Sequence, residues 1–386
     1  MSAIVEVEAV PLRAGRDAGD LDSSAETVVV RLTDEEGRTG IGEADAPALA
    51  VRELVLMKGV HGWSRGLGEV LLGRDPFERE ALWNDLYEAT IYHGRRGLGI
   101  HALSAVDVAV HDLAGKQLGR PVHELLGGAL RDRVRPYATA WPGPVGERTL
   151  AEMMEVTSAL LEQALGLGFH AVKMELFLGE LARDRDLVGF VREGRSLLGD
   201  DVTLMLDFGY RWRDWRDALA VLRGVEDYDV FFAEATLHHD DLAGHRKLAA
   251  RSGIRIAGGE MAATVAECRE WLELGGVHVL QPDLSRSGGF TELRRIAELA
   301  SAAGAIVVPH AWKTGITIAA ASHFHAATPN VPFVEFLSPA LVDSPLRAAL
   351  TRPEPALEDG TLPLPAGPGL GIELVEDVVT KYRVDV

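Results

Sequence analysis

The stretch Val202-Thr-Leu-Met-Leu-Asp-Phe-Gly-Tyr210 has the character of a buried strand that ends on a carboxylate, Asp207. Its apolar residues form a nearly continuous run, as in a strand that is covered on both faces. Later segments repeat this pattern of a short apolar run ending on an ionisable side chain; they are 230–234, 254–260, 277–283, 305–310 and 332–335. Such a series is typical of a parallel α/β barrel, whose active site lies at the C-terminal ends of the strands.

The strand-like runs between residues 134 and 337 number eight, and most are separated by segments with helical spacing. Eight parallel strands joined by right-handed crossovers close a barrel. The runs are 134–140, 170–176, 202–208, 230–235, 255–260, 278–284, 305–310 and 333–337. We therefore predict an α/β fold with a (β/α)8 TIM-type barrel at residues 131–350.

The first 130 residues follow a different pattern. Strand-like segments at 4–10 and 27–33 and a third ending at Glu43 precede helical segments, of which 103–118 is the clearest. Strands followed by helices indicate an N-terminal α+β capping domain at 1–130. We expect the Pro- and Gly-rich segment 351–386 to pack back on this domain. The loops 14–24 and 44–52 are either surface connections or a mobile lid.

Length and composition limit the class of protein. A chain of 386 residues fits a barrel of about 250 residues with an accessory domain. The formal charge of −19 disfavours nucleic acid and anionic membrane surfaces as partners. No apolar stretch is long enough for a membrane span, and the N-terminus lacks a basic start. A single cysteine, Cys268, fits a reducing compartment, so we expect a cytoplasmic protein. With nucleic acid and membranes disfavoured as partners, we expect it to act on a small molecule.

Three of the ionisable strand ends are carboxylates on consecutive strands, Asp207, Glu234 and Glu260. Because neighbouring strands lie about 4.8 Å apart, these side chains are expected to converge and to repel one another unless a cation lies among them. A hard divalent ion with oxygen ligands, most simply Mg²⁺, suits this set. The sequence therefore predicts a magnesium site.

The next strands end on Asp283 and His310. A carboxylate beside an imidazole fixes its tautomer and raises its basicity, which predicts a general base facing the metal. Glu335 ends the last strand. It can pair with a neighbouring base, or it can stay neutral and donate a hydrogen bond to an oxygen on which negative charge develops.

Lys173 and Glu175 lie two residues apart on the second strand and should therefore both point into the ring. Lys173 is suited to stabilise an anionic oxygen, whereas Glu175 can neutralise Lys173 or act as an acid on the second face of the substrate. Trp312 and Lys313 follow His310 and are candidates for the mouth of the pocket, and Arg52 is either a residue that reaches an anionic substrate or a basic surface position.

The run His238-His-Asp-Asp241 has the residue types of a metal site but also those of a solvated helix start, and we favour the helix start.

A divalent metal facing a basic histidine indicates abstraction of a proton next to a carboxylate. The resulting enediolate can be reprotonated, as in a racemase or epimerase, or it can expel a β-substituent, as in a dehydratase.

The ordered set from Lys173 to Glu335, together with the phrases Gln281-Pro-Asp-Leu-Ser-Arg-Ser-Gly-Gly289 and Val308-Pro-His310, resembles the enolase superfamily and its mandelate racemase subgroup. The resemblance implies a barrel with a capping domain, a multimer, and Mg²⁺ bound by the three carboxylates. It also implies that His310 with Asp283 is the base and Glu335 the electrophilic donor, and that the loops 14–24 and 44–52 set substrate choice.

One position departs from that resemblance. Racemases of the subgroup carry Lys-x-Lys on the second strand, where this chain has Glu175. A one-base reaction is therefore favoured, namely dehydration of an acid sugar to a 2-keto-3-deoxy acid. The alternatives are an epimerase that uses Glu175, a catalytically silent barrel, and a metal hydrolase. The hydrolase usually has a His-x-His on the first strand, where this chain reads Tyr137-Ala-Thr-Ala-Trp141.

Overall fold

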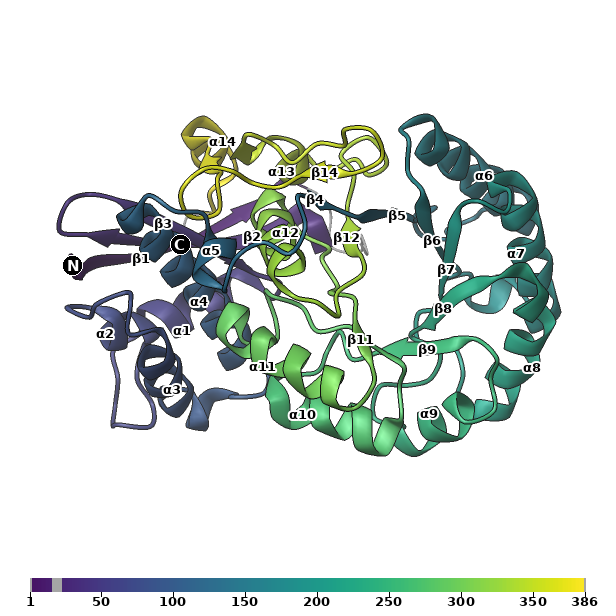
Figure 1. The fold of residues 1–386 in the computed structure, drawn as a ribbon, viewed down its shortest axis with the longest axis horizontal. Helices are drawn as coiled ribbons and strands as arrows, with labels where there is room; N and C mark the ends of the chain where they lie inside the picture. Colours follow the sequence, from purple (N-terminus) through teal and green to yellow (C-terminus); the bar gives the residue numbers. More distant parts are fainter. Residues whose placement is uncertain (1, 16–22, 385–386) are drawn as a thin grey trace.

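The computed structural model describes residues 2–15 and 23–384. A three-stranded antiparallel sheet and several helices form the N-terminal module at one end of the molecule, and a curled sheet of parallel strands with its outer helices forms the other (Figure 1). The strands of the first module are β1 (Ile4–Arg13), β2 (Glu26–Asp34) and β3 (Thr39–Ala44), in the order β1-β2-β3. Its helices are α1 (Ala48–Leu56), α2 (Leu67–Leu71), α3 (Arg79–Ala89), α4 (Leu98–Leu118) and α5 (Val122–Leu125).

Helix α4 lies directly on β3 because two glycines of β3 leave room for its backbone. A Cβ on Gly42 would collide with the carbonyl oxygen of Ala105, and one on Gly40 would lie 2.6 Å from Cβ of Leu113. Gly119 in the left-handed conformation ends the helix, as the sequence predicts. The close packing of α4 fixes the position of β3 and of the residues that follow it.

The predicted α/β barrel is confirmed as a sheet of eight parallel strands in the order β11-β10-β9-β8-β7-β6-β5-β12. All eight predicted segments contain a strand, although the later ones are short. The strands are β5 (Pro136–Ala140), β6 (Ala171–Glu175), β7 (Thr203–Asp207), β8 (Val230–Glu234), β9 (Arg255–Gly258), β10 (Val279–Leu280), β11 (Ile306–Val307) and β12 (Val334–Phe336).

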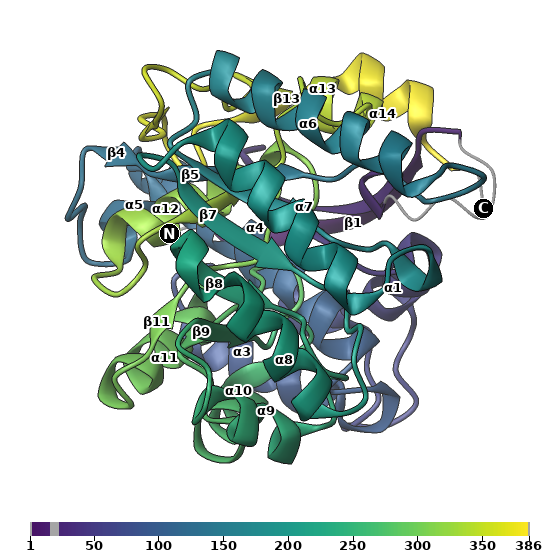
Figure 2. The ribbon, with the colours of Figure 1, turned by 90° about the vertical axis from the view of Figure 1, so that its right-hand side faces the viewer.

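The sheet curls around a central axis, with helices along its outer side (Figure 1), and several of these helices lie in front of the strands in the second view (Figure 2). Within the described part of the chain, no hydrogen-bonded ladder joins β11 to β12. That seam is bridged at the strand ends, where the backbone N–H of Ala311 donates to Glu335 Oε2 at 2.9 Å. The outer helices are α6 (Leu150–Gly166), α7 (Asp184–Leu198), α8 (Trp215–Val225), α9 (Leu242–Ala249), α10 (Thr264–Glu270), α11 (Gly289–Ala302) and α12 (Gly315–Ala327).

Side chains alternate along the barrel strands between the ring interior and the outer helices. On β6, Val172 and Met174 join the large core beneath the helices, whereas Ala171 belongs to a separate interior cluster. The other members of that interior cluster include Tyr137, Met205, Phe232, Ala257 and Val279. Lys173 and Glu175 share the face of Ala171, so both point into the ring as predicted.

The C-terminal segment contacts both parts of the molecule. It contains α13 (Pro345–Ala349), β13 (Thr351–Arg352), β14 (Leu362–Pro363), β15 (Glu373–Leu374) and α14 (Glu376–Tyr382); β14 pairs with β4 (Arg133–Val134). Arg31 of β2 forms an ion pair with Glu376 at 2.6 Å, and the N–H of Val384 donates to the carbonyl of Pro11. The domain boundaries at residues 130 and 350 stay predictions.

Four short 3₁₀ turns belong to the described structure, at Ser23–Ala25, Ile91–His93, Gly179–Leu181 and Glu226–Tyr228. A π-helical turn spans Trp271–Gly275. Cys268 is buried in α10. Among the helices formed by residues 2–15 and 23–384, none is both long and apolar enough to cross a membrane.

Candidate active site

A cavity of about 900 Å³ opens at the C-terminal ends of the barrel strands. Its walls come from strand ends and from the loops that follow β6 and β7. The predicted site residues that line it are Lys173, Glu175, Asp207, Glu260, His310, Trp312 and Glu335. Further lining residues that the sequence did not single out include Trp141, Phe177, Tyr210, Arg213 and Arg286.

The three predicted metal ligands lie on consecutive strands or just beyond them. Asp207 and Glu234 are register partners at the ends of β7 and β8. Glu260 lies two residues past the end of β9, after Gly258 and Gly259. Lys173 reaches between the first two, with Nζ 2.9 Å from Glu234 Oε2 and 3.5 Å from Asp207 Oδ2. The hydroxyl of Tyr210 donates to Glu260 Oε1.

Burial and mutual repulsion disfavour the ionised forms of Asp207 and Glu234, as expected for a site that suits a cation. Burial raises the pKa of Asp207 to about 6, with Lys173 opposing the rise and Glu260 adding to it. Burial also raises the pKa of Glu234, to about 8. The charge of Lys173 opposes this rise, and the charges of Asp207 and Glu260 add to it. Glu234 Oε1 is buried without a hydrogen-bond partner among the described residues. An unpaired carboxylate oxygen among like charges fits a divalent cation with oxygen ligands.

The three carboxylates Asp207, Glu234 and Glu260 are not among the groups whose ligand atoms lie closest together in the described chain. Within residues 2–15 and 23–384, the sets of three whose ligand atoms lie within 4.8 Å of one another are His238–His239–Asp240 and Asp45–Asp283–His310. The second set already contacts two cations, because Arg286 and Lys313 both form ion pairs with Asp45. The first set is partly or largely exposed, and Asp241 beside it caps α9 through the N–H of Gly244, as predicted for a helix start.

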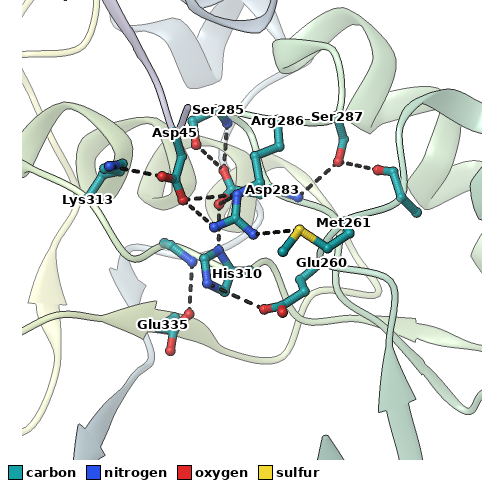
Figure 3. Close-up of polar contacts among 12 residues, drawn as sticks. Asp45, Glu260, Met261, Asp283, Ser285, Arg286, Ser287, His310, Lys313 and Glu335 are labelled. Atoms are coloured by element: carbon teal, nitrogen blue, oxygen red, sulfur yellow. Dashed lines mark hydrogen bonds and ion pairs between the residues drawn. The ribbon is translucent and has the colours of Figure 1, made fainter. Parts of the chain in front are cut away.

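The Asp283–His310 pair is the most fully defined part of the site (Figure 3). The two residues form a parallel bridge in line with β10 and β11, and Asp283 Oδ2 lies 2.6 Å from His310 Nδ1. The other oxygen, Oδ1, accepts from the backbone N–H and the hydroxyl of Ser285, each at 2.6 Å. Asp283 is thus held in place, which leaves His310 Nε2 facing the cavity side, 3.5 Å from Glu260 Oε2.

The surroundings of His310 favour its protonated form. Burial and the charge of Arg286 lower its affinity for a proton, but the hydrogen bond with Asp283 and the charges of Glu335 and Glu260 raise the pKa of His310 to about 9. A base with a raised pKa takes up a proton strongly, which suits abstraction from a weak carbon acid.

Glu335 accepts hydrogen bonds on both carboxylate oxygens. Oε1 lies 2.7 Å from Thr139 Oγ1 and 3.0 Å from Lys173 Nζ, and Oε2 accepts from the N–H of Ala311. Burial opposes its ionisation, but the charges of Lys173 and His310 and these hydrogen bonds lower the pKa of Glu335 to about 2. In this structure Glu335 is therefore an ionised acceptor, which favours the pairing interpretation over that of a neutral donor.

Glu175 is 6% exposed and lines the cavity without a hydrogen bond or ion pair to the described residues. Burial, together with the charge of its register partner Asp207, raises the pKa of Glu175 well above its usual range, although Lys173 opposes this. The ammonium of Lys173 instead contacts Asp207, Glu234 and Glu335. The interpretation of Glu175 as the neutralising partner of Lys173 thus has no contact to support it.

A group of charges that no sequence pattern predicted links the N-terminal module to this site (Figure 3). Asp45 directly follows β3, and its Oδ2 accepts from Arg286 Nε at 2.9 Å and from Nη2 of the same side chain. Its Oδ1 lies 2.9 Å from Lys313 Nζ. The neighbouring cations hold the pKa of Asp45 well below its usual range despite its burial. Both Asp45 and Arg286 lie inside segments noted in the sequence, but only the packing of the two modules pairs them.

Tyr210 is a second residue that the sequence did not single out. Its φ of +59° lies in the left-handed region, which is strained for an aromatic residue. Such strain persists only where the surroundings enforce it, and it often marks a functional position. Its hydroxyl holds Glu260, so it orients one of the predicted metal ligands.

The predicted substrate-binding residues separate in space. Trp312 lines the cavity and packs edge-on against Trp141. Lys313 is buried and binds Asp45 and the carbonyl of Glu26. Arg52 lies on α1, outside the residues that line the cavity, and pairs with Glu53. Most of the predicted loop 14–24 lies outside the described residues, and the loop 44–52 is largely the first turn of α1.

A curved parallel sheet with a base and clustered carboxylates at its strand ends defines a class of barrel enzyme, and comparison with known proteins specifies the family. Residues 4–127 match the mandelate racemase/muconate lactonizing enzyme N-terminal domain, and residues 156–378 match the enolase C-terminal domain-like family. The chain belongs to the mandelate racemase subgroup of the enolase superfamily, as its residues predicted.

Relatives with curated functions cover nearly the whole chain. D-galactarolactone cycloisomerase from Agrobacterium fabrum is 33% identical over 92% of this chain and 91% of its own length. L-rhamnonate dehydratase from Saccharopolyspora erythraea is 32% identical over 97% of this chain and 89% of its own length. A crystal structure of a racemase from Streptomyces coelicolor A3(2) with bound magnesium is 27% identical, with a TM-score of 0.83 over 99% of this chain and 100% of that one.

These comparisons show that the chain is an enzyme. Its curated relatives include carbon–oxygen lyases that dehydrate acid sugars, such as D-gluconate dehydratase from Thermoproteus tenax, and a cycloisomerase.

Proposed function

We propose that this enzyme removes the α-proton of an acid sugar and expels the β-hydroxyl, giving a 2-keto-3-deoxy acid, with Mg²⁺ as its cofactor. The observation that carries the proposal is the Asp283–His310 pair, whose His310 lines a cavity together with Lys173, Asp207 and Glu260. The dehydratases among the relatives support the reaction class, because they match this chain over almost its full length.

In this proposal, Asp207, Glu234 and Glu260 hold Mg²⁺. The bound ion supplies positive charge that polarises the substrate carboxylate and stabilises the electron density that moves onto it. Lys173 adds a second, fixed positive charge at the same end of the substrate. Burial disfavours its charged form, but the charges of Glu234, Glu335 and Asp207, which its ammonium contacts, raise its pKa well above the usual range and keep it protonated.

His310 acts as the base in the first step. In the neutral form of His310, Nδ1–H donates to Asp283, so Nε2 carries the lone pair that takes the α-proton. The electron pair of the broken C–H bond moves toward the substrate carboxylate. In the second step it returns to form the Cα–Cβ double bond, the β C–O bond breaks, and the leaving hydroxide takes the proton from His310. The resulting enol rearranges to the 2-keto acid.

Two carboxylates have supporting roles in this scheme. Glu335 fixes the ammonium of Lys173 and the backbone after His310, so it positions both charged groups. Glu175 faces the cavity on the β6 side and is free to contact a substrate oxygen. Trp312 forms an apolar part of the wall against the carbon chain. A substrate contact of Arg52 or Lys313 stays a prediction.

Epimerisation or cycloisomerisation is the second candidate, because it proceeds through the same carbanion. It is favoured by the position of Glu175, which offers a proton source away from His310, and by the cycloisomerase among the relatives. A proton delivered to the opposite face of the α-carbon would invert it without loss of water.

A screen of aldonic and aldaric acids with Mg²⁺ tests the proposal, with formation of 2-keto product as the readout and His310→Asn as the blank. We expect one or a few acids to be dehydrated by the wild-type enzyme and none by the variant. The same library in D₂O distinguishes the second candidate, since α-deuteration without keto product indicates epimerisation. Absence of both products from every acid contradicts the proposal.

We also propose that the enzyme acts in the cytoplasm as a homo-oligomer. The buried thiol of Cys268 is compatible with a reducing compartment, and multimers are what the family resemblance implies. Light scattering of the purified enzyme tests the oligomeric state directly.

A further inference from the structure

The guanidinium of Arg286 has one edge bound to protein and another edge that is nearly free. Nε and Nη2 both donate to Asp45, whereas the hydrogen-bond contact of Nη1 within the described chain is the thioether of Met261 at 3.6 Å. A thioether is a weak acceptor, so the donor capacity of Nη1 is largely unused. The side chain is 11% exposed and lines the cavity.

A buried cation with an unused donor is costly unless another acceptor reaches it. The charge itself is compensated by Asp45, and Asp283 Oδ2 lies 4.0 Å from Nε. Neither carboxylate satisfies Nη1. The cavity is the direction from which an acceptor can come, because Arg286, His310 and Glu260 share its wall.

The neighbours of Arg286 indicate which part of a substrate meets it. Figure 3 shows the guanidinium beside His310 and Met261, on the side away from Glu335. Under the function proposed above, the substrate carboxylate lies toward Lys173 and the three metal-binding carboxylates. An oxygen on the His310 side is then a hydroxyl of the carbon chain near the carbons that react.

We propose that Arg286 binds a chain hydroxyl of the acid sugar through Nη1, and that Asp45 of the N-terminal module is the positioning residue that aims it. This inference rests on the proposed dehydration of an acid sugar. Asp45 does not line the cavity, so it acts on the substrate through Arg286. The planar fork of arginine suits the task, because two donors stay on Asp45 while the third nitrogen faces the substrate.

The test compares Arg286→Met, Arg286→Lys and Asp45→Asn with the wild-type enzyme, using D-gluconate, D-galactonate, L-rhamnonate and D-galactarate with Mg²⁺. We expect Arg286→Met to lower kcat/KM by about 10- to 100-fold, the effect of losing a hydrogen bond to a charged donor. Most of the change should appear in KM. Arg286→Lys should recover part of it, and Asp45→Asn should raise KM less than Arg286→Met does.

A double variant shows whether Asp45 orients Arg286 or only stabilises the fold. If Asp45 acts through Arg286, Asp45→Asn should change KM little once Arg286 is already Met, so the two effects should not add. Arg295→Met is the matched control, because Arg295 of α11 also joins the modules, through Glu80 of α3, but lies outside the cavity wall. It should lower the melting temperature without changing KM.

Two kinds of failure are distinguishable. Turnover by the wild-type enzyme with an unchanged KM in Arg286→Met, or additive effects in the double variant, overturns the assignment of Arg286 and Asp45 and leaves the dehydratase proposal intact. If the wild-type enzyme neither dehydrates nor deuterates any of the four acids, the proposed function fails and this inference fails with it.

Discussion

Tyr210 combines a strained backbone with a hydrogen bond to a predicted metal ligand. Its φ of +59° places the ring so that the hydroxyl reaches Glu260, and its ring also lies edge-on to His239. Groups that orient a ligand from behind typically change metal affinity by one to two orders of magnitude when they are removed. The strain thus has a clear use if Glu260 binds a metal.

We therefore expect Tyr210→Phe to weaken Mg²⁺ binding by about tenfold, measured by calorimetry without substrate. The substitution removes the hydroxyl but keeps the ring and its packing. Tyr228→Phe is the control, since Tyr228 lies in the turn before β8 and outside the cavity wall. Equal affinity in wild type and Tyr210→Phe contradicts a role in orienting Glu260.

Asp283 depends on Ser285 for its orientation. The hydroxyl of Ser285 donates to Oδ1 at 2.6 Å, and the same oxygen also receives the N–H of Ser285. Ser285→Ala removes one charge-assisted hydrogen bond and keeps the other, so we expect kcat to fall by about 3- to 30-fold with an intact fold. A steady-state assay with the acid identified in the screen measures it; a loss as complete as that of His310→Asn would indicate a direct role instead.

The site residues differ in how far the sequence could predict them. Asp207 and Glu234 end buried strands, Asp283 and His310 follow the short strands β10 and β11, and the period of the barrel brings these strand ends together, so their proximity follows from local pattern. Asp45 belongs to another module, and its contact with Arg286 depends on how two separately folded surfaces meet. No periodicity encodes that contact.

At the scale of elements, β3 and α4 depend on the absence of side chains at their contact. Gly42 faces the carbonyl oxygen of Ala105, so Gly42→Ala should force the helix away and lower the free energy of unfolding by about 1–3 kcal/mol. Gly62→Ala is the control, because a Cβ there meets no atom within 4 Å. Chemical denaturation of both variants measures the difference, and equal stability contradicts the packing argument.

Gly189 in α7 gives the opposite expectation. It lies inside a helix, and an added Cβ would have no neighbour within 4 Å. Gly189→Ala should stabilise the protein by about 0.5–1 kcal/mol, because alanine restricts the unfolded chain and favours the helix. The same denaturation experiment checks it, and a loss of stability would show a hidden steric conflict.

The lengths of the elements were less predictable than their existence. The predicted runs 278–284 and 305–310 contain strands of only two residues, β10 and β11. Their later residues leave the ladder, so that Asp283 and His310 meet through an isolated bridge and the side-chain hydrogen bond. Apolar character predicts that a segment is buried, but where pairing stops depends on the curvature of the sheet and the bonds available at its seam.

At the scale of the whole molecule, buried histidines between the modules make stability depend on pH. Burial lowers the pKa of His323 to about 3, and burial with the charge of Arg131 lowers the pKa of His325 to about 4. Both lie on α12, which packs against α5 of the N-terminal module. Because the unfolded chain binds protons near pH 6.5, these neutral histidines contribute stability above that pH that is lost as the pH falls toward 4.

We expect the free energy of unfolding to fall by about 1–2 kcal/mol for His323 alone between pH 7 and pH 5, measured by denaturant titration at each pH. The variant His323→Gln should show a shallower dependence over this range, whatever its stability at pH 7. An identical slope in wild type and variant contradicts the assignment.

The contacts of β1 and β2 with residues 376–384 have a consequence for the order of folding. Val384 donates to Pro11, Leu12 bridges Arg383, and Arg31 pairs with Glu376, so these two strands receive partners from a segment that follows the whole barrel in the sequence. Contacts between such distant segments close a very long loop of chain and therefore form late. A chain that lacks α14 leaves β1 and β2 without these partners.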